Sequence, residues 1–371
     1  MDADARGTAL GCTDHPAGLG ESRRLLAPAA DRLLELEYTT WGFGDSVAFE
    51  AMVVASRVLG DDRCLRFAQG WFRAWATRAQ PYRRLDCTAP GLAMVQVYEA
   101  TGDSRVLEAA VGLAGYLRSR PRLDGVFETW ESSPLMHPYG PRPLDAAGVR
   151  LLADPPPGVF VDCLHFDPPF LTALGRVVGD DDLVDEGVAQ ALGYIRLLQR
   201  PDGLFDHFVL SGTPGTYGPG WGRGQGWALL GLLDVADRLP PGDPRRDELM
   251  QAIGRLVTAM VALQRPDGSW PVVVTDAGSG HESSTAAFFA HGLARAARCG
   301  AVPEEQAGDA ATRALRATLA CMTSDSTLAG VSAAVMACTE PAHYAHVPRG
   351  FDVPWGQGPL VLALSELVDG G

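Results

Sequence analysis

The sequence predicts an all-α fold, an (α/α)6 toroid (a six-hairpin barrel). Three observations lead to this prediction. Several stretches repeat one plan, in which an apolar helix, a Gly-Asp-type turn and a second, amphipathic helix follow one another. The first helix of each pair is apolar over more of its surface than the second, which indicates that the first lies inside the second. The chain ends on a single helix, which a closed ring would pair with a helix near the N-terminus.

The turns place the hairpins along the chain. Five complete hairpins are expected at residues 45–78, 90–119, 167–199, 226–264 and 284–321. The last stretch, residues 359–367, has only its first helix, and residues 25–37 form the partner that would close the ring. An open solenoid is the alternative, and its two ends would require polar caps.

One domain, residues 1–371, is expected to contain the whole ring, with residues 1–24 as a partly ordered N-terminal extension. Two loops, 199–203 and 264–268, share the sequence Gln-Arg-Pro-Asp-Gly, and Pro-Asp-Gly favours a tight turn. Each loop joins a second helix to the next first helix. Long links at 132–159 and 211–222 belong to the same side of the predicted ring, so the ligand site is expected there.

Composition excludes several functions. Asp and Glu total 45 against 31 basic residues, and the net charge of −14 argues against binding nucleic acid or an anionic membrane. Every basic residue is Arg, which excludes a Schiff-base lysine, a phosphate-loop lysine and a Ser-Lys dyad. The seven Cys are scattered singly, so we expect neither a metal site nor a disulfide framework. No signal peptide or membrane span is evident, and a cytoplasmic monomer or small homo-oligomer is expected.

The segment 221–227, Trp-Gly-Arg-Gly-Gln-Gly-Trp, is the most unusual in the chain. Its three glycines allow close approach of a ligand to the backbone, and Trp221 and Trp227 offer faces on which sugars stack. Arg223 is a natural bidentate partner for a carboxylate, and the helix that begins here favours an anion. A tight structural turn with two core Trp explains the segment equally well. Trp41 is a further candidate for a sugar-binding wall, although packing is its commoner use.

This segment resembles the Trp-Ala-Arg-Gly-Asn-Gly-Trp motif of the unsaturated rhamnogalacturonyl and unsaturated glucuronyl hydrolases, glycoside hydrolase families 105 and 88. Gln225 replaces the usual Asn. Further segments resemble the same family in the same order: 161–162 with 169–171, 202–207, 282–290 and 356–360. Together they extend over most of the chain from about Tyr38. The sequence departs from the family pattern at Asp206, where Tyr is common, at Leu210, where Asp is usual, and at His165, where an apolar residue is usual.

The resemblance implies a hydrolase that uses no metal or organic cofactor. Its substrate would be an oligosaccharide, produced by a lyase, with a 4,5-unsaturated uronic acid at its non-reducing end. Asp162 would protonate C4 of the enol ether, water would add at C5, and the product would open. Asp86 matches a second carboxylate of the family, and two neighbouring carboxyl groups push their pKa values apart. The substrate-binding candidates are Arg223, Trp221, Trp227, His207, Gln225, Trp41 and His165.

Simpler roles exist for these residues. Asp86 and Asp162 each precede a helix and could be N-caps, and a lone His such as His207 is more often structural than catalytic. Other functions also stay open: an inverting glycosidase or a sugar epimerase with a toroid fold, or a non-catalytic helical-repeat scaffold. An epimerase would be expected to rely on paired His, and the eight His show no such spacing.

Overall fold

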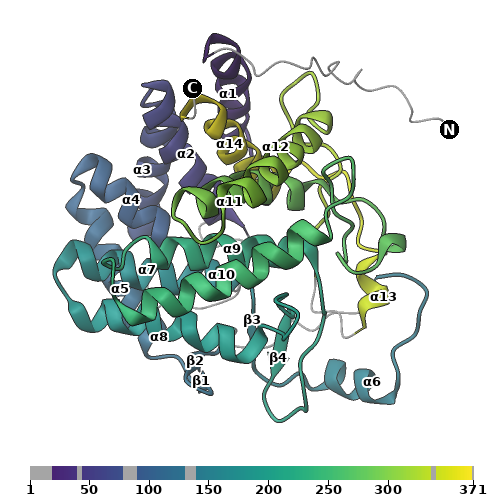
Figure 1. The fold of residues 1–371 in the computed structure, drawn as a ribbon. Helices are drawn as coiled ribbons and strands as arrows, with labels where there is room; N and C mark the ends of the chain where they lie inside the picture. The colour runs from purple at the N-terminus through teal and green to yellow at the C-terminus, as the bar shows by residue number, and fades with distance from the viewer. Residues whose placement is uncertain (1–18, 40–43, 78–89, 130–138, 336–339, 370–371) are drawn as a thin grey trace.

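The computed structural model describes residues 19–39, 44–77, 90–129, 139–335 and 340–369. Within these residues, the first helix of each hairpin contributes to an inner ring (Figure 1). The inner helices are α2 (Asp45–Leu59), α4 (Gly91–Thr101), α7 (Cys163–Val178), α9 (Gly222–Ala236), α11 (Ser283–Arg298) and α14 (Pro354–Asp369). Each contacts the next in this order, and α14 contacts α2. The predicted closed toroid is therefore confirmed, and the open solenoid is excluded.

An outer layer surrounds this ring. Its helices are α1 (Leu19–Leu33), α3 (Arg63–Ala76), α5 (Ser104–Arg118), α8 (Asp181–Leu198), α10 (Pro244–Ala262) and α12 (Glu304–Ala320). Helix α1 packs against α14 and α2, as predicted for the N-terminal segment that closes the ring. The extension expected at 1–24 overlaps α1 from residue 19 onward, and residues 1–18 lie outside the described part of the chain.

The two layers differ in burial as the sequence predicted. Every residue of α9 is buried, whereas α10 buries one stripe that runs from Leu249 to Met260. The Gly-Asp turns also have a physical explanation at the second hairpin. Gly102 ends α4 with φ 68°, in the left-handed region that favours glycine, and the Asp103 side chain accepts from the Arg105 N–H to cap α5.

Some inner helices begin earlier than predicted. Helices α7 and α9 start four residues before the expected positions, and α14 starts five residues before. The residues added at the start of α9 include Gly222 and Gly224, and glycine is a poor helix former. Burial in the ring outweighs this local preference, because an inner helix satisfies its backbone within the apolar core.

Short elements gather at one end of the ring (Figure 1). Strand β3 (Gly158–Phe160) pairs antiparallel with β4 (Phe208–Leu210), and Phe160 lies opposite Phe208. Helices α6 (Ala146–Ala153) and α13 (Pro341–Tyr344) lie on the same side. A hairpin of β1 (Arg122–Leu123) and β2 (Val126–Phe127) and a short 3-10 helix, η1 (Ala277–Ser279), complete the described elements.

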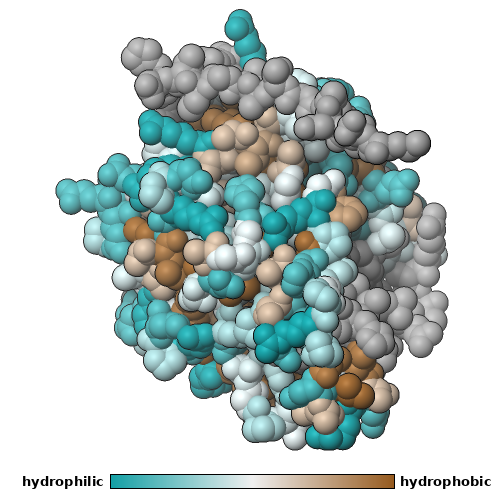
Figure 2. Space-filling model, turned by 90° about the vertical axis from the view of Figure 1, so that its right-hand side faces the viewer, coloured by the Kyte–Doolittle hydropathy of each residue, from teal (hydrophilic) through white to brown (hydrophobic). Residues whose placement is uncertain are grey.

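Hydrophilic and hydrophobic side chains are interspersed over the face shown in Figure 2. The exposed large hydrophobic residues come from separate elements: Val111, Val149, Val178 and Phe351. None of the described helices combines the length and the apolar character that crossing a membrane requires.

Close packing between inner helices gives a test of the ring. A Cβ added at Gly231 of α9 would lie 2.2 Å from the Leu164 carbonyl oxygen of α7, whereas one added at Gly308 of α12 would meet no heavy atom within 4 Å. We expect Gly231→Ala to lower the free energy of unfolding by about 1–3 kcal/mol, through overpacking. Gly308→Ala should raise it by about 0.5–1 kcal/mol, because Ala is the better helix former. Denaturant unfolding of both variants checks this, and equal shifts would contradict the packing of α7 on α9.

Candidate active site

The N-termini of the inner helices carry the candidate residues. Asp162 directly precedes α7, Trp221 precedes α9, Glu282 precedes α11, and Trp355 lies in the first turn of α14. The backbone N–H groups at a helix N-terminus favour an anion. This end of the ring is therefore the one suited to an acidic ligand.

The pairing of β3 with β4 brings Asp162 to His207. Just beyond the strands, the Val161 N–H donates to the His207 carbonyl at 2.8 Å, which continues the pairing. Asp162, the next residue after Val161, is therefore close to His207. The His207 Nε2 atom lies 3.4 Å from Asp162 Oδ2. Both side chains are buried.

Asp162 occupies the N-cap position of α7, but its side chain makes no capping hydrogen bond. Among the described residues, its buried Oδ1 atom has no hydrogen-bond partner. A buried carboxylate oxygen is usually bonded, because leaving it unpaired costs free energy. The exception at Asp162 suits a group that exchanges a proton with a ligand rather than one that holds a helix end.

Aromatic groups enclose the imidazole of His207. The centroid of the Trp221 ring lies 4.3 Å away, and Phe160 and Phe208 lie edge-on to it. On the other side, Nδ1 is 2.7 Å from the Tyr344 hydroxyl oxygen. Sequence reasoning missed Tyr344, which comes from the short helix α13 and carries no local signal of its own.

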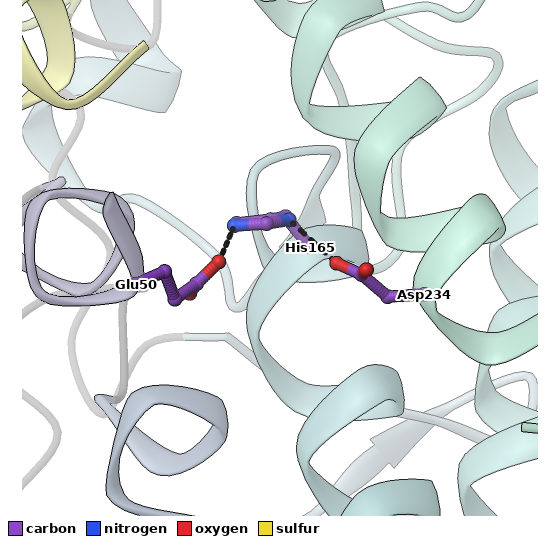
Figure 3. A group of neighbouring side chains, drawn as sticks. All are labelled: Glu50, His165 and Asp234. Atoms are coloured by element: carbon purple, nitrogen blue, oxygen red, sulfur yellow. Dashed lines mark ion pairs between the residues drawn. The ribbon is translucent and has the colours of Figure 1, made fainter. Parts of the chain in front are cut away.

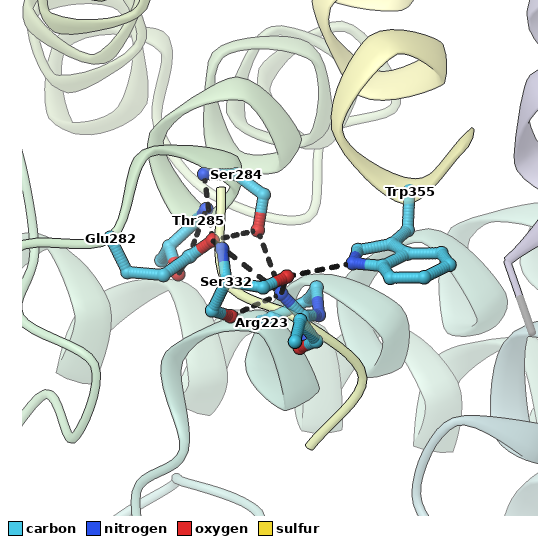
Figure 4. Close-up of polar contacts among 7 residues, drawn as sticks. Arg223, Glu282, Ser284, Thr285, Ser332 and Trp355 are labelled. Atoms are coloured by element: carbon cyan, nitrogen blue, oxygen red, sulfur yellow. Dashed lines mark hydrogen bonds and ion pairs between the residues drawn. The ribbon is translucent and has the colours of Figure 1, made fainter. Parts of the chain in front are cut away.

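Arg223 is buried against the Trp221 ring. Its guanidinium holds residues 332–333, and Figure 4 shows its contact with Ser332. Its Nη1 atom donates to Ser332 Oγ at 2.7 Å, and Nη2 donates to the Ala333 carbonyl at 2.9 Å. Burial lowers the pKa of Arg223, and the nearby carboxylates of Glu282 and Asp162 partly offset this. The predicted bidentate bond to a substrate therefore competes with acceptors that the protein itself supplies.

Glu282 organises the same network as the N-cap of α11 (Figure 4). Its two carboxylate oxygens accept from the backbone N–H groups of Ser284 and Thr285 at 3.2 and 3.1 Å. It also accepts from the Ser332 N–H at 3.2 Å, and its Oε1 lies 3.5 Å from Arg223 Nη1. Since both of its oxygens are bonded, Glu282 acts here as a structural anchor.

Gln225 clamps the loop that carries His207. Its Oε1 accepts from the Phe205 N–H, and its Nε2 donates to the Phe205 carbonyl, both at 2.8 Å. A third bond joins Nε2 to the Trp221 carbonyl at 3.0 Å. Gln225 therefore positions the site through the backbone, and its amide groups are already paired.

Trp227 and His165 lie deeper in the ring. The Trp227 ring is fully buried against Phe166 and Phe288. His165 of α7 lies between carboxylates from the inner helices α2 and α9, with Nε2 3.2 Å from Glu50 and Nδ1 3.9 Å from Asp234 (Figure 3). Trp227 and His165, both predicted to bind substrate, therefore contact other side chains of the core.

Arg295 is a second cation beside the carboxylates that face His165. Arg295 donates to Asp234 at 2.8 Å. Burial tends to lower the pKa of His165, but the carboxylates of Glu50 and Asp234 outweigh it and raise the pKa. One ligand atom from each of Glu50, His165 and Asp234 lies within 4.8 Å of the others, which is close enough for a metal ion. However, the two ring nitrogens face opposite carboxylates and Arg295 occupies Asp234, so the geometry favours ion pairing.

A cavity of about 450 Å³ lies at the opposite end of the ring, between the C-terminal halves of α11 and α14 and the N-terminal part of α12. Its lining includes Ala294, Ala311 and the ion pair of Arg298 with Glu366. The residues that surround Asp162 lie at the N-terminal ends of the inner helices, so this cavity is separate from the candidate site.

The family model of Glycosyl Hydrolase Family 88 matches residues 29–369. The chain belongs to glycosyl hydrolase family 88. It is therefore a glycoside hydrolase, as the motifs predicted.

Relatives and solved structures agree with this membership. The hydrolase is 25% identical over 348 residues to the unsaturated rhamnogalacturonyl hydrolase YesR of Bacillus subtilis, covering 91% of each chain. A family 105 glycoside hydrolase from C. acetobutylicum superposes with a TM-score of 0.77 at 18% identity, covering 93% of this chain and 98% of that one. The unsaturated glucuronyl hydrolase of Bacillus sp. GL1 gives 0.68 at 18% identity, covering 95% and 97%. These structures support the toroid fold.

The structure groups some of the predicted site residues and separates others. Asp162, His207, Trp221 and Arg223 form one cluster, and Gln225 supports it through the backbone. Asp86 and Trp41, also predicted for the site, lie outside the described residues.

The residues that depart from the family pattern also have places in the structure. Asp206 accepts from the Thr216 hydroxyl, lies 3.6 Å from Arg200, and has a pKa raised by burial. Leu210 packs with Phe160 and Phe208 in a small separate cluster.

The His165 ion pairs predict how the stability of the hydrolase depends on pH. Because the pKa of His165 is raised in the folded state, its contribution is fully present below the unfolded pKa of about 6.5 and is lost as pH rises through the folded pKa. His165→Gln leaves two buried carboxylates with one cation fewer, and should destabilise the fold by about 3–5 kcal/mol. Thermal melts should show a wild-type advantage that is larger at pH 6 than at pH 9. An advantage that grows with pH would contradict a protonated His165.

Proposed function

We propose that this glycoside hydrolase removes a 4,5-unsaturated uronic acid from the non-reducing end of oligosaccharides that polysaccharide lyases produce. The observation that carries the proposal is the buried Asp162 carboxylate, which faces His207 and keeps one oxygen without a partner among the described residues. YesR, which matches over almost the whole chain, is named for hydrolysis of unsaturated rhamnogalacturonyl substrates, and this supports the substrate class.

In the proposed reaction, protonated Asp162 transfers its proton to C4 of the enol ether. The ring oxygen stabilises the positive charge that develops at C5, and water adds there while its proton passes to the Asp162 carboxylate. The product is a hemiketal, which opens to a C5 ketone and releases the rest of the oligosaccharide from C1. Protonation at carbon distinguishes this route from ordinary glycoside hydrolysis, in which an acid protonates the glycosidic oxygen. Asp86 stays the proposed second carboxylate.

Several features suit a uronate in this site. The N-termini of α7, α9 and α11 converge here, and Arg223 supplies a buried positive charge that interacts with Asp162. Trp221 lies against both His207 and Arg223, so it links the acid-base pair to the cation. We therefore propose that Arg223 recognises the uronate through its charge, while its own hydrogen bonds hold residues 332–333.

The proposal includes a cytoplasmic location and a monomer or small homo-oligomer. The described cysteines Cys64, Cys299 and Cys321 are free thiols, which supports a reducing compartment.

Replacing the proposed acid tests the reaction. Asp162→Asn should lower turnover by at least about 100-fold, because an amide cannot deliver the proton. The control is Asp180→Asn, since Asp180 caps the outer helix α8 and Asn caps equally well. Turnover is followed by the loss of ultraviolet absorbance of lyase-generated disaccharides, beside thermal melts. Substantial turnover by Asp162→Asn, or no loss of absorbance with the wild type on any member of the panel, would contradict the proposal.

Charge recognition by Arg223 is tested with two forms of one disaccharide, the free acid and its methyl ester. A charge-assisted contact contributes about 1.5–3 kcal/mol, so Arg223→Gln, which removes the charge but keeps an amide donor for residues 332–333, should raise KM for the acid by about 10- to 150-fold. The KM for the ester should change much less, because the ester carries no charge. Equal changes for the acid and the ester would show that Arg223 acts only by holding residues 332–333.

A further inference from the structure

We propose that Tyr344 is a positioning residue of the active site. Its hydroxyl donates to Nδ1 of His207 and fixes the tautomer in which Nε2 carries the proton and faces Asp162. The importance of this contact for turnover rests on the proposed function, whereas the tautomer itself does not.

The geometry places His207 between two oxygen atoms. Nδ1 lies 2.7 Å from the Tyr344 hydroxyl, and Nε2 lies 3.4 Å from Asp162 Oδ2. A neutral imidazole has one N–H. A hydroxyl can donate or accept, whereas an ionised carboxylate only accepts, so Asp162 at Nε2 favours the N–H at that nitrogen and leaves Nδ1 to accept from Tyr344. Among the described residues, the other rings around His207 are those of Phe160, Phe208 and Trp221, and none of them supplies an oxygen to Nδ1.

The backbone fixes the opposite side of the same contact. Gly218 has φ 65°, and a Cβ there would lie 2.1 Å from the Tyr344 hydroxyl oxygen and 2.7 Å from His207 Cβ. The Gly218 and Tyr217 carbonyls both accept from the His207 N–H. Only glycine leaves room for the hydroxyl at this point, so the loop is built around the bond between Tyr344 and His207.

Helix α13 is anchored where it presents Tyr344. His343 Nε2 lies 3.2 Å from the Arg142 carbonyl, and the Arg142 side chain pairs with Glu340 at 2.7 Å. After the helix, Arg349 donates to the carbonyls of Ala345 and Ser279 at 3.1 and 2.9 Å. Tyr344 itself is fully buried.

This arrangement has a consequence for the reaction. When Nε2 carries the proton, it can donate to the Asp162 carboxylate after the acid has given its proton to C4. Without the hydroxyl, the imidazole could adopt the other tautomer, in which Nε2 is an acceptor and no longer stabilises the carboxylate. Catalytic imidazoles are commonly held in one tautomer by a hydrogen bond to the nitrogen that faces away from the reaction, and Tyr344 would supply that bond here.

The first arm of the test is kinetic. Tyr344→Phe should lower kcat by about 10- to 100-fold and leave KM within about threefold, because the residue acts through His207 and not on the sugar. The control is Tyr38→Phe, which removes a buried hydroxyl that donates to the Leu33 carbonyl at the same distance of 2.7 Å. Tyr38→Phe should keep the wild-type kcat. Equal losses of kcat in the two variants, or an unchanged kcat in Tyr344→Phe, would overturn the proposal.

The second arm does not depend on the substrate. Nitrogen-15 spectra of the imidazoles report the tautomer, and His207→Gln identifies the His207 signals. The wild type should show the proton on Nε2, and Tyr344→Phe should show a mixture or the other tautomer, while Tyr38→Phe matches the wild type. A proton on Nδ1 in the wild type, or an unchanged tautomer in Tyr344→Phe, would overturn the assignment. If the wild type is inactive on every unsaturated disaccharide, the proposed function fails, but these spectra still decide the role of Tyr344.

Discussion

The antiparallel contact between residues 158–160 and 208–210 sets the geometry of the whole site. These strands precede different inner helices, and their pairing places Asp162 opposite His207. The neighbouring groups then hold this pair in place, because Gln225 fixes the His207 loop and Tyr344 fixes the imidazole. A site assembled from loops needs this kind of cross-bracing, because loops alone do not fix side chains within a fraction of an ångström.

The toroid supplies the second constraint, which is direction. All the inner helices that carry site residues present their N-termini at one end, so their backbone N–H groups converge where an acidic sugar would bind. Deeper in the ring, four charged groups from four inner helices compensate one another's charge: Glu50 of α2, His165 of α7, Asp234 of α9 and Arg295 of α11. The core beneath the candidate site therefore contains charged groups that are paired with one another.

The sequence was sufficient for the architecture, because Gly-Asp turns and the contrast between inner and outer helices are local signals. It also identified the segment around Arg223, but not the protein acceptors that occupy its guanidinium, since Ser332 and Ala333 are more than a hundred residues away. Tyr344 was missed for the same reason, being 137 residues from His207. His165 lies one helical turn from Asp162, but its surroundings are set by two other helices, and neither could be located from spacing alone.

Protonation at C4 is the central claim, and hydrolysis in heavy water followed by proton NMR tests it most directly. If Asp162 delivers the proton to one face of the enol ether, the released uronate should carry a single deuterium at C4 in one configuration, formed together with the loss of ultraviolet absorbance. An enzyme that protonated the glycosidic oxygen would first release a sugar with its double bond intact, and later uptake at C4 would give both configurations. Deuterium in both configurations, or absorbance that outlasts release of the partner sugar, would contradict the account.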